Sequence, residues 1–146
     1  MKKTNKKGFT LVELLAVIVI LGVLLMIAVP AIQNVIKKSK KNAFESAAKL
    51  AVENVETMAS AEALSGKLNA KCYVPITDIN LERGDWGKNP QGYVEVETTG
   101  KATIYISNSN YSGSGNTNTF TFDSSATAKG NKPSDATISK CTWWEK

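Results

Sequence analysis

The stretch that decides the fold is GFTLVELLAVIVILGVLLMIAVP, which runs from Gly8 to Pro30. No charged side chain occurs between Leu14 and Ile32. About 20 apolar residues at a helical rise of 1.5 Å cover roughly the 30 Å of a bilayer core. A short basic head precedes the stretch and contains Lys2, Lys3, Lys6 and Lys7. The pattern predicts a helix of membrane length.

Gly8 and Glu13 distinguish this stretch from an ordinary signal peptide, which carries its small-residue cleavage site after the apolar region. Because Gly8 precedes the apolar run, cleavage after it would remove the lysines and keep the helix. Glu13 places a carboxylate inside the run, at a cost of roughly 2.5 to 3.5 kcal/mol if it reached mid-membrane. Glu13 is therefore expected to need a partner.

The sequence KGFTLVE, Lys7 to Glu13, resembles the processing and assembly motif of type IV prepilins. The resemblance is specific in sequence from Lys7 to about Pro30. Beyond Pro30 only the predicted architecture is similar. It implies cleavage between Gly8 and Phe9 by a prepilin peptidase, N-methylation of the new Phe9 amine, and polymerisation into a surface filament. In the same comparison, Glu13 corresponds to the assembly carboxylate.

Physical chemistry gives Glu13 a partner in such a filament. The methylated Phe9 amine stays cationic, and an isolated cation in an apolar bundle is as costly as an isolated carboxylate. Our hypothesis is that Glu13 of an incoming subunit pairs with the Phe9 amine of its neighbour and sets the axial register. The alternative is a carboxylate at the membrane edge, solvated by lipid headgroups.

Gly22 and Pro30 interrupt the apolar run. Proline in a helix interior costs about 3 kcal/mol because it removes a backbone bond and clashes with the preceding turn. The resemblance implies that the helix between Gly22 and Pro30 can lose its helical bonding and extend in assembled pili. A kink without melting is the alternative.

The length of 146 residues and a hydrophobic content of 42% support one modest globular domain in addition to the helix. We expect three parts: residues 1–8 as a leader that is removed, 9–36 as the transmembrane and filament-core helix, and 37–146 as a head that includes the second half of the helix. The formal net charge is +5, and four of the lysines lie in the leader. A nearly neutral mature chain gives no support from bulk charge for nucleic-acid binding.

Histidine is absent, which removes the commonest general base and metal ligand. The sequence shows no nucleophile and base pair, phosphate loop or metal-ligand cluster, so we expect no enzymatic activity, no metal and no cofactor. Cys72 and Cys141 are the only cysteines, in a chain whose N-terminus is typical of export. We predict a disulfide outside the cytoplasm, worth about 4 kcal/mol on the chain-entropy model. Two free buried thiols are the alternative.

The head is predicted to be α+β. Beyond Pro30 the helical period continues to a stop at Ser65 and Gly66, and residues 67–91 read as a loop. Alternation then predicts four antiparallel strands near 93–99, 102–107, 119–122 and 138–144, with exposed polar loops at 108–118 and about 124–135. The fold expected from the resemblance is that of type IV pilins, a long N-terminal helix packed on a four-stranded antiparallel sheet. The helix face expected to contact the sheet contains Phe44, Ala48, Ala51, Val55 and Met58.

Three other groups of residues are candidate sites. Asp78, Asn80, Glu82 and Asp85 are rich in oxygen, but Arg83 stands where a calcium-binding EF-hand loop needs glycine. The glycosylation sequon Asn110-Tyr111-Ser112 is short enough to arise by chance. Trp143 and Trp144, beside Lys140 and Lys146, could stack on bases or sugars. On a strand they would point to opposite faces, one into the core and one partly exposed, and packing is the favoured interpretation.

The function predicted from these features is that of a structural subunit of a type IV pilus, or fimbrium. The precursor would be a single-pass protein of the cytoplasmic membrane, and the product an extracellular filament used in adhesion, surface or twitching motility, or DNA uptake. The basic cluster Lys37 to Lys41 would lie just outside the membrane, as a solvated face or in contact with anionic lipid.

Several partners follow from the resemblance: other copies of the chain, a prepilin peptidase that also methylates, an assembly ATPase and a platform membrane protein. Membrane lipid before assembly and a host surface or DNA afterwards are further expected contacts. Two alternatives remain open: a pseudopilin of a type II secretion or competence system, and a membrane-tethered sugar- or DNA-binding module. The lysine- and asparagine-rich composition is typical of a low-GC Gram-positive source.

Overall fold

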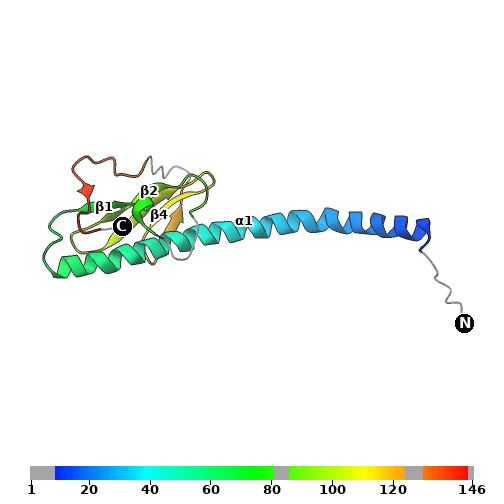
Figure 1. The fold of residues 1–146 in the computed structure, drawn as a ribbon, viewed down its shortest axis with the longest axis horizontal. Helices are drawn as coiled ribbons and strands as arrows, with labels where there is room; N and C mark the ends of the chain where they lie inside the picture. The colour runs from blue at the N-terminus through cyan, green and yellow to red at the C-terminus, as the bar shows by residue number, and fades with distance from the viewer. Residues whose placement is uncertain (1–8, 81–85, 124–129, 145–146) are drawn as a thin grey trace, which may run out of the picture. The chain divides into compact units, whose positions relative to one another are not determined.

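A computed structural model describes residues 9–80, 86–123 and 130–144 (Figure 1). The chain divides into two compact units, Met1–Ser39 and Lys40–Lys146, which are considered separately below. Helix α1 (Leu11–Leu64) contributes its first part to the first unit and the remainder to the second. Within the first unit, α1 is helical through both Gly22 and Pro30.

In the second unit, the C-terminal part of α1 covers one face of a β-sheet (Figure 1). The prediction that Met58 lies on the contact face is wrong, because 43% of Met58 is exposed and Ala59 is buried instead. Ala59 lies four residues after Val55 and so continues the buried stripe on the next turn. The buried helix residues are Phe44, Ala47, Ala48, Ala51, Val52, Val55 and Ala59.

The helix ends where the sequence predicted. Gly66 adopts the left-handed conformation (φ 72°), and its N–H donates to the Ala63 carbonyl at 3.1 Å. The Lys67 N–H donates to the Glu62 carbonyl at 3.1 Å. These two bonds form a Schellman cap, which satisfies carbonyls that the last helical turn leaves open.

The sheet has six strands in the described residues, in the order β5-β4-β3-β2-β1-β6. Strand pairing is antiparallel except between β1 and β6, which run parallel. The predicted α+β class is therefore confirmed, whereas the predicted four-stranded, purely antiparallel sheet is wrong. A short 3-10 helix, η1 (Ile76–Asp78), follows β1. The strands are β1 (Cys72–Pro75), β2 (Gln91–Val96), β3 (Ala102–Ser107), β4 (Ser112–Gly115), β5 (Phe120–Phe122) and β6 (Ser139–Lys140).

Strand β4 was missed because its sequence, SGSG, has the composition of a loop. Its glycine at position 113 is required by close packing, since an added Cβ would lie 2.7 Å from ring atoms of Phe120 on the neighbouring strand. Phe120 and Phe122 of β5 in turn contact Phe44 of α1, with ring centroids 6.1 and 6.2 Å away. Gly113 thus leaves room for an aromatic cluster at this end of the core.

Candidate functional site

Thr10 and Glu13 form a reciprocal capping box at the start of α1. The Thr10 N–H donates to Glu13 Oε2 at 2.8 Å, and the Glu13 N–H donates to Thr10 Oγ1 at 3.2 Å. The Thr10 hydroxyl also donates to Glu13 Oε2 at 2.9 Å. These bonds satisfy donors that a helix N-terminus otherwise leaves open, and the carboxylate lies at the positive end of the helix dipole.

The capping box gives Glu13 a partner within its own chain. The capping role of Thr10 was not predicted, although Thr-x-x-Glu before an apolar run is a readable capping signature. Phe9 is 88% exposed and immediately precedes Thr10. Gly8, the predicted cleavage determinant, lies outside the described residues, so cleavage and methylation at this junction stay predictions.

The first unit presents a continuous apolar surface. Its large aliphatic side chains from Leu11 to Ile36 are exposed within the chain, and Glu13 is the single charged residue between Phe9 and Ile36. This part of α1 is long and apolar enough to cross a membrane, and none of it is buried within the chain. Exposed apolar surface of this extent marks a contact with lipid or protein.

In the second unit, the predicted disulfide between Cys72 and Cys141 is present, with the Cα atoms 4.9 Å apart. It joins the start of β1 to the residue after β6. The Cys141 N–H also donates to the Tyr73 carbonyl at 2.9 Å. The bond therefore holds the C-terminal segment at the edge of the sheet.

The oxygen-rich run considered for calcium is only partly described, because Glu82 and Asp85 lie outside the described residues. The carboxylate of Asp78 forms an ion pair of 2.5 Å with Lys140, and its carbonyl accepts the Trp144 Nε1–H at 3.3 Å. No group of three or more candidate metal ligands occurs in the described part of the chain. Asp78 thus links η1 to the C-terminal segment.

Trp143 and Trp144 are both half-buried against the core, so the predicted division into one buried and one exposed tryptophan is wrong. Strand β6 ends at Lys140, and strand alternation therefore does not apply to these residues. The two rings meet edge to face at 6.1 Å. The Trp143 Nε1–H is buried without a hydrogen-bond partner in the described residues.

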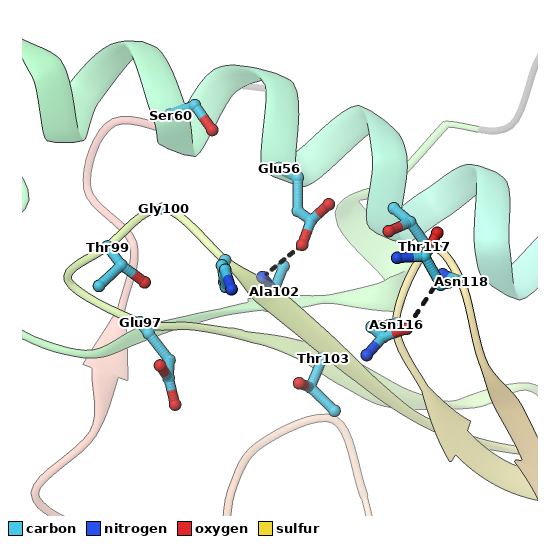
Figure 2. A pocket seen from close by; sticks show the side chains of 11 residues that line it. Glu56, Ser60, Glu97, Thr99, Gly100, Ala102, Thr103, Asn116, Thr117 and Asn118 are labelled. Atoms are coloured by element: carbon cyan, nitrogen blue, oxygen red, sulfur yellow. Dashed lines mark hydrogen bonds between the residues drawn. The ribbon is translucent and has the colours of Figure 1, made fainter.

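A polar cavity of about 550 Å³ lies beside α1 at the turn between β2 and β3. Figure 2 shows Glu56 reaching from α1 to the Ala102 N–H, which donates to Glu56 Oε1 at 3.0 Å, while Glu97 extends away from it. Asn116 Oδ1 accepts the Asn118 and Thr119 N–H groups at 3.0 and 2.8 Å. Because the Glu56 and Asn116 side chains bond the backbone, we interpret the cavity as a structural junction between helix and sheet.

These features describe a class of protein with two parts. The first is an exposed apolar helix with a capped carboxylate at its start, and the second is an α+β head whose C-terminal segment is held by a disulfide. The family profile described as "Prokaryotic N-terminal methylation motif" matches residues 3–29. This match covers residues 3–8 of the predicted leader, Glu13 and most of the apolar run.

The chain is similar to type IV pilus proteins. It is 35% identical over 104 residues to a type IV major fimbrial protein FimA of Dichelobacter nodosus, which covers 71% of this chain and 63% of the relative. It is 34% identical over 98 residues to the type IV major alpha-pilin of Moraxella bovis, covering 66% of this chain and 52% of that protein. The chain thus spans half to two thirds of these relatives' lengths. No solved structure matches it.

In its N-terminal motif and over these matched lengths, the chain resembles the type IV pilins. The fold agrees, since an apolar N-terminal helix continues into a head built on an antiparallel-rich sheet. The motif and the helix also fit a precursor anchored in a membrane.

Proposed function

We propose that the chain is a structural, non-enzymatic subunit of a type IV pilus. One observation supports the proposal most strongly: the methylation motif is followed by an exposed apolar helical segment, and the carboxylate of that segment, Glu13, lies at its start. Residues 1–8 are the leader, 9–36 anchor the precursor and later form the filament core, and 37–146 form the displayed head. A prepilin peptidase cuts between Gly8 and Phe9 and methylates Phe9.

In this proposal the capping box stabilises the stored subunit. Thr10 holds the Glu13 carboxylate while the subunit lies in the membrane, where an unpartnered charge is costly. During assembly, Glu13 exchanges this contact for the methylated Phe9 amine of a neighbouring subunit. The helix between Gly22 and Pro30 then extends as the subunits pack. An assembly ATPase and a platform membrane protein drive the transfer.

The test is the location of the processed chain in a strain that assembles it. Cells are sheared, and the amounts of chain in the filament fraction and in the cells are compared by immunoblot. The proposal expects most of the processed chain in the sheared fraction, in filaments visible by electron microscopy.

A pseudopilin is the alternative that this experiment addresses, because processed chain that stays with the cells would favour it. A tethered binding module would likewise stay with the cells and would not polymerise. Either result would contradict the proposed role as a filament subunit.

A further inference from the structure

The face of the sheet opposite α1 carries a row of tyrosines. Tyr93 on β2 lies directly opposite Tyr105 on β3, with ring centroids 5.3 Å apart. Tyr73 on β1 continues the row, 6.1 Å from Tyr93. Because strand residues alternate between faces, these rings stand on the side opposite the buried valines and isoleucines, and all three are partly exposed.

A groove of about 530 Å³ lies beside Tyr73 and Tyr93. Its other wall is the segment Lys132–Ile138, which contributes both apolar surface and the polar side chains of Lys132, Ser134 and Asp135. A groove of this volume that joins aromatic faces to a few polar groups is typical of a small-ligand site.

The second wall is held at both ends. Before it, Asn131 Oδ1 accepts the Gly92 N–H at 3.0 Å. After it, β6 pairs with β1, and Cys141 is bonded to Cys72. In its middle, Asp135 Oδ1 accepts the Thr137 N–H at 2.9 Å and the Thr137 hydroxyl at 2.7 Å. A wall formed in advance lowers the ordering cost of binding.

The charged side chains that line the groove balance each other, so they do not favour an anionic ligand. Its described lining contains one cation, Lys132, and one carboxylate, Asp135, whose pKa is lowered by the two Thr137 hydrogen bonds. Lys71 on the neighbouring surface lies 3.7 and 3.5 Å from Glu95 and Glu97. Burial, with smaller effects of Tyr105 and Glu95, raises the pKa of Tyr93, so its hydroxyl stays a neutral donor. A nucleic acid would require a surplus of positive charge.

We propose that this groove binds a neutral sugar unit of a glycan. The rings of Tyr73 and Tyr93 meet edge to face at 76°, so the flat face of Tyr93 packs against the C–H face of the sugar ring while Tyr73 contacts its rim. Lys132, Ser134 and Asp135 form hydrogen bonds with its hydroxyls. The site is separate from Trp143 and Trp144 at the C-terminal end of the chain. Sugar binding in the groove does not require filament formation, so this proposal and the proposed pilus function can fail separately.

The experiment is saturation-transfer NMR on the full-length chain in a zwitterionic detergent that contains no sugar. The probes are glucose, galactose, N-acetylglucosamine and N-acetylgalactosamine. We expect transfer to ring protons of at least one probe. Its Kd should rise roughly tenfold, about 1.4 kcal/mol, in Tyr93→Ala, while Tyr93→Phe keeps binding. Tyr105→Ala is the matched control, because Tyr105 belongs to the row but does not line the groove.

Ser134→Trp provides a second test that leaves the sheet intact, since Ser134 is exposed and the new ring would fill the groove. Loss of binding in this variant supports the proposal. The proposal is overturned if no probe receives saturation, or if Tyr93→Ala and Ser134→Trp both bind as well as the parent chain. It is also overturned if only heparin or an oligonucleotide binds in a salt-sensitive way, or if Ser134→Trp changes self-association alone.

Discussion

The Glu13 carboxylate has a partner at both stages of the proposed function. In the single chain it accepts two hydrogen bonds from Thr10 at the helix start. In the filament it is proposed to pair with a neighbour's amine. The capping bonds need no second chain, whereas the ion pair is the interaction that selects another copy. Substitutions at the two positions therefore separate the two roles.

Glu13→Ala should lower the amount of sheared filament by roughly tenfold or more, because a buried cation without its partner costs several kcal/mol. Thr10→Ala should have a much smaller effect, since the Thr10 N–H still bonds the carboxylate. Quantitative immunoblots of sheared fractions measure both. Glu53→Ala, which changes an exposed glutamate of the head, is the control. Equal filament yields for Glu13→Ala and Glu53→Ala would disprove the pairing.

The Cys72 to Cys141 disulfide gives a second prediction about individual residues. The double variant Cys72→Ser, Cys141→Ser should lower the free energy of unfolding by about 2–4 kcal/mol, because the unfolded chain gains freedom. Urea unfolding followed by tryptophan fluorescence measures this loss, since all three tryptophans lie in the head. Chemical reduction of the parent chain should lower the midpoint of its urea unfolding to that of the double variant. An unchanged midpoint in both would show that the bond does not stabilise the head.

At the scale of elements, local signals predicted more than long-range ones. The helix, its end at Gly66, the strands β2, β3 and β5 and the α+β class were readable because each follows a periodicity or a turn residue. Strand β4 was not, because its glycines are explained only by contacts that form in the folded chain, with the Phe120 ring at Gly113 and with the Thr119 carbonyl at Gly115. The parallel pairing of β6 with β1 likewise depends on residues far apart in the chain.

The contact between α1 and the sheet gives a prediction at this scale. Phe44 is buried against Tyr111, Phe120 and Phe122, so Phe44→Ala should lower the free energy of unfolding by about 3–5 kcal/mol. Met58→Ala should cost much less, because Met58 lies off the buried stripe. The same urea titration compares them. Similar losses for both variants would mean that the buried stripe is misplaced.

Glu56 connects the helix to the sheet by a single hydrogen bond. Glu56→Ala leaves the partly buried Ala102 N–H unpaired and should cost about 1–3 kcal/mol. Glu56→Gln should recover most of the loss, because its amide oxygen can accept the same bond. Glu53→Ala on the exposed face of the helix should have little effect. If the Glu56 and Glu53 variants unfold alike, the Ala102 bond does not contribute.

At the scale of the whole molecule, the chain joins a unit whose described residues, 9–39, form no packed core to a folded head. The N-terminal motif was readable from sequence because its residues are contiguous, from Gly8 to Glu13. The tyrosine groove was not, because strands β1 and β2 and the segment 132–138 build it from separate parts of the chain. The hydrogen bond from the Gly92 N–H to Asn131 was visible only in the folded structure, whereas the Cys72 to Cys141 bond was predicted from the two cysteines of the sequence.

The most direct test of the account is mass spectrometry of the intact, non-reduced chain and its N-terminal peptide, taken from material sheared off cells. We predict a chain that begins at methylated Phe9 and is two hydrogens lighter for the Cys72 to Cys141 bond. A chain that still carries Lys2 to Gly8 would contradict the processing on which the account rests. Correctly processed chain found only with the cells would contradict the filament.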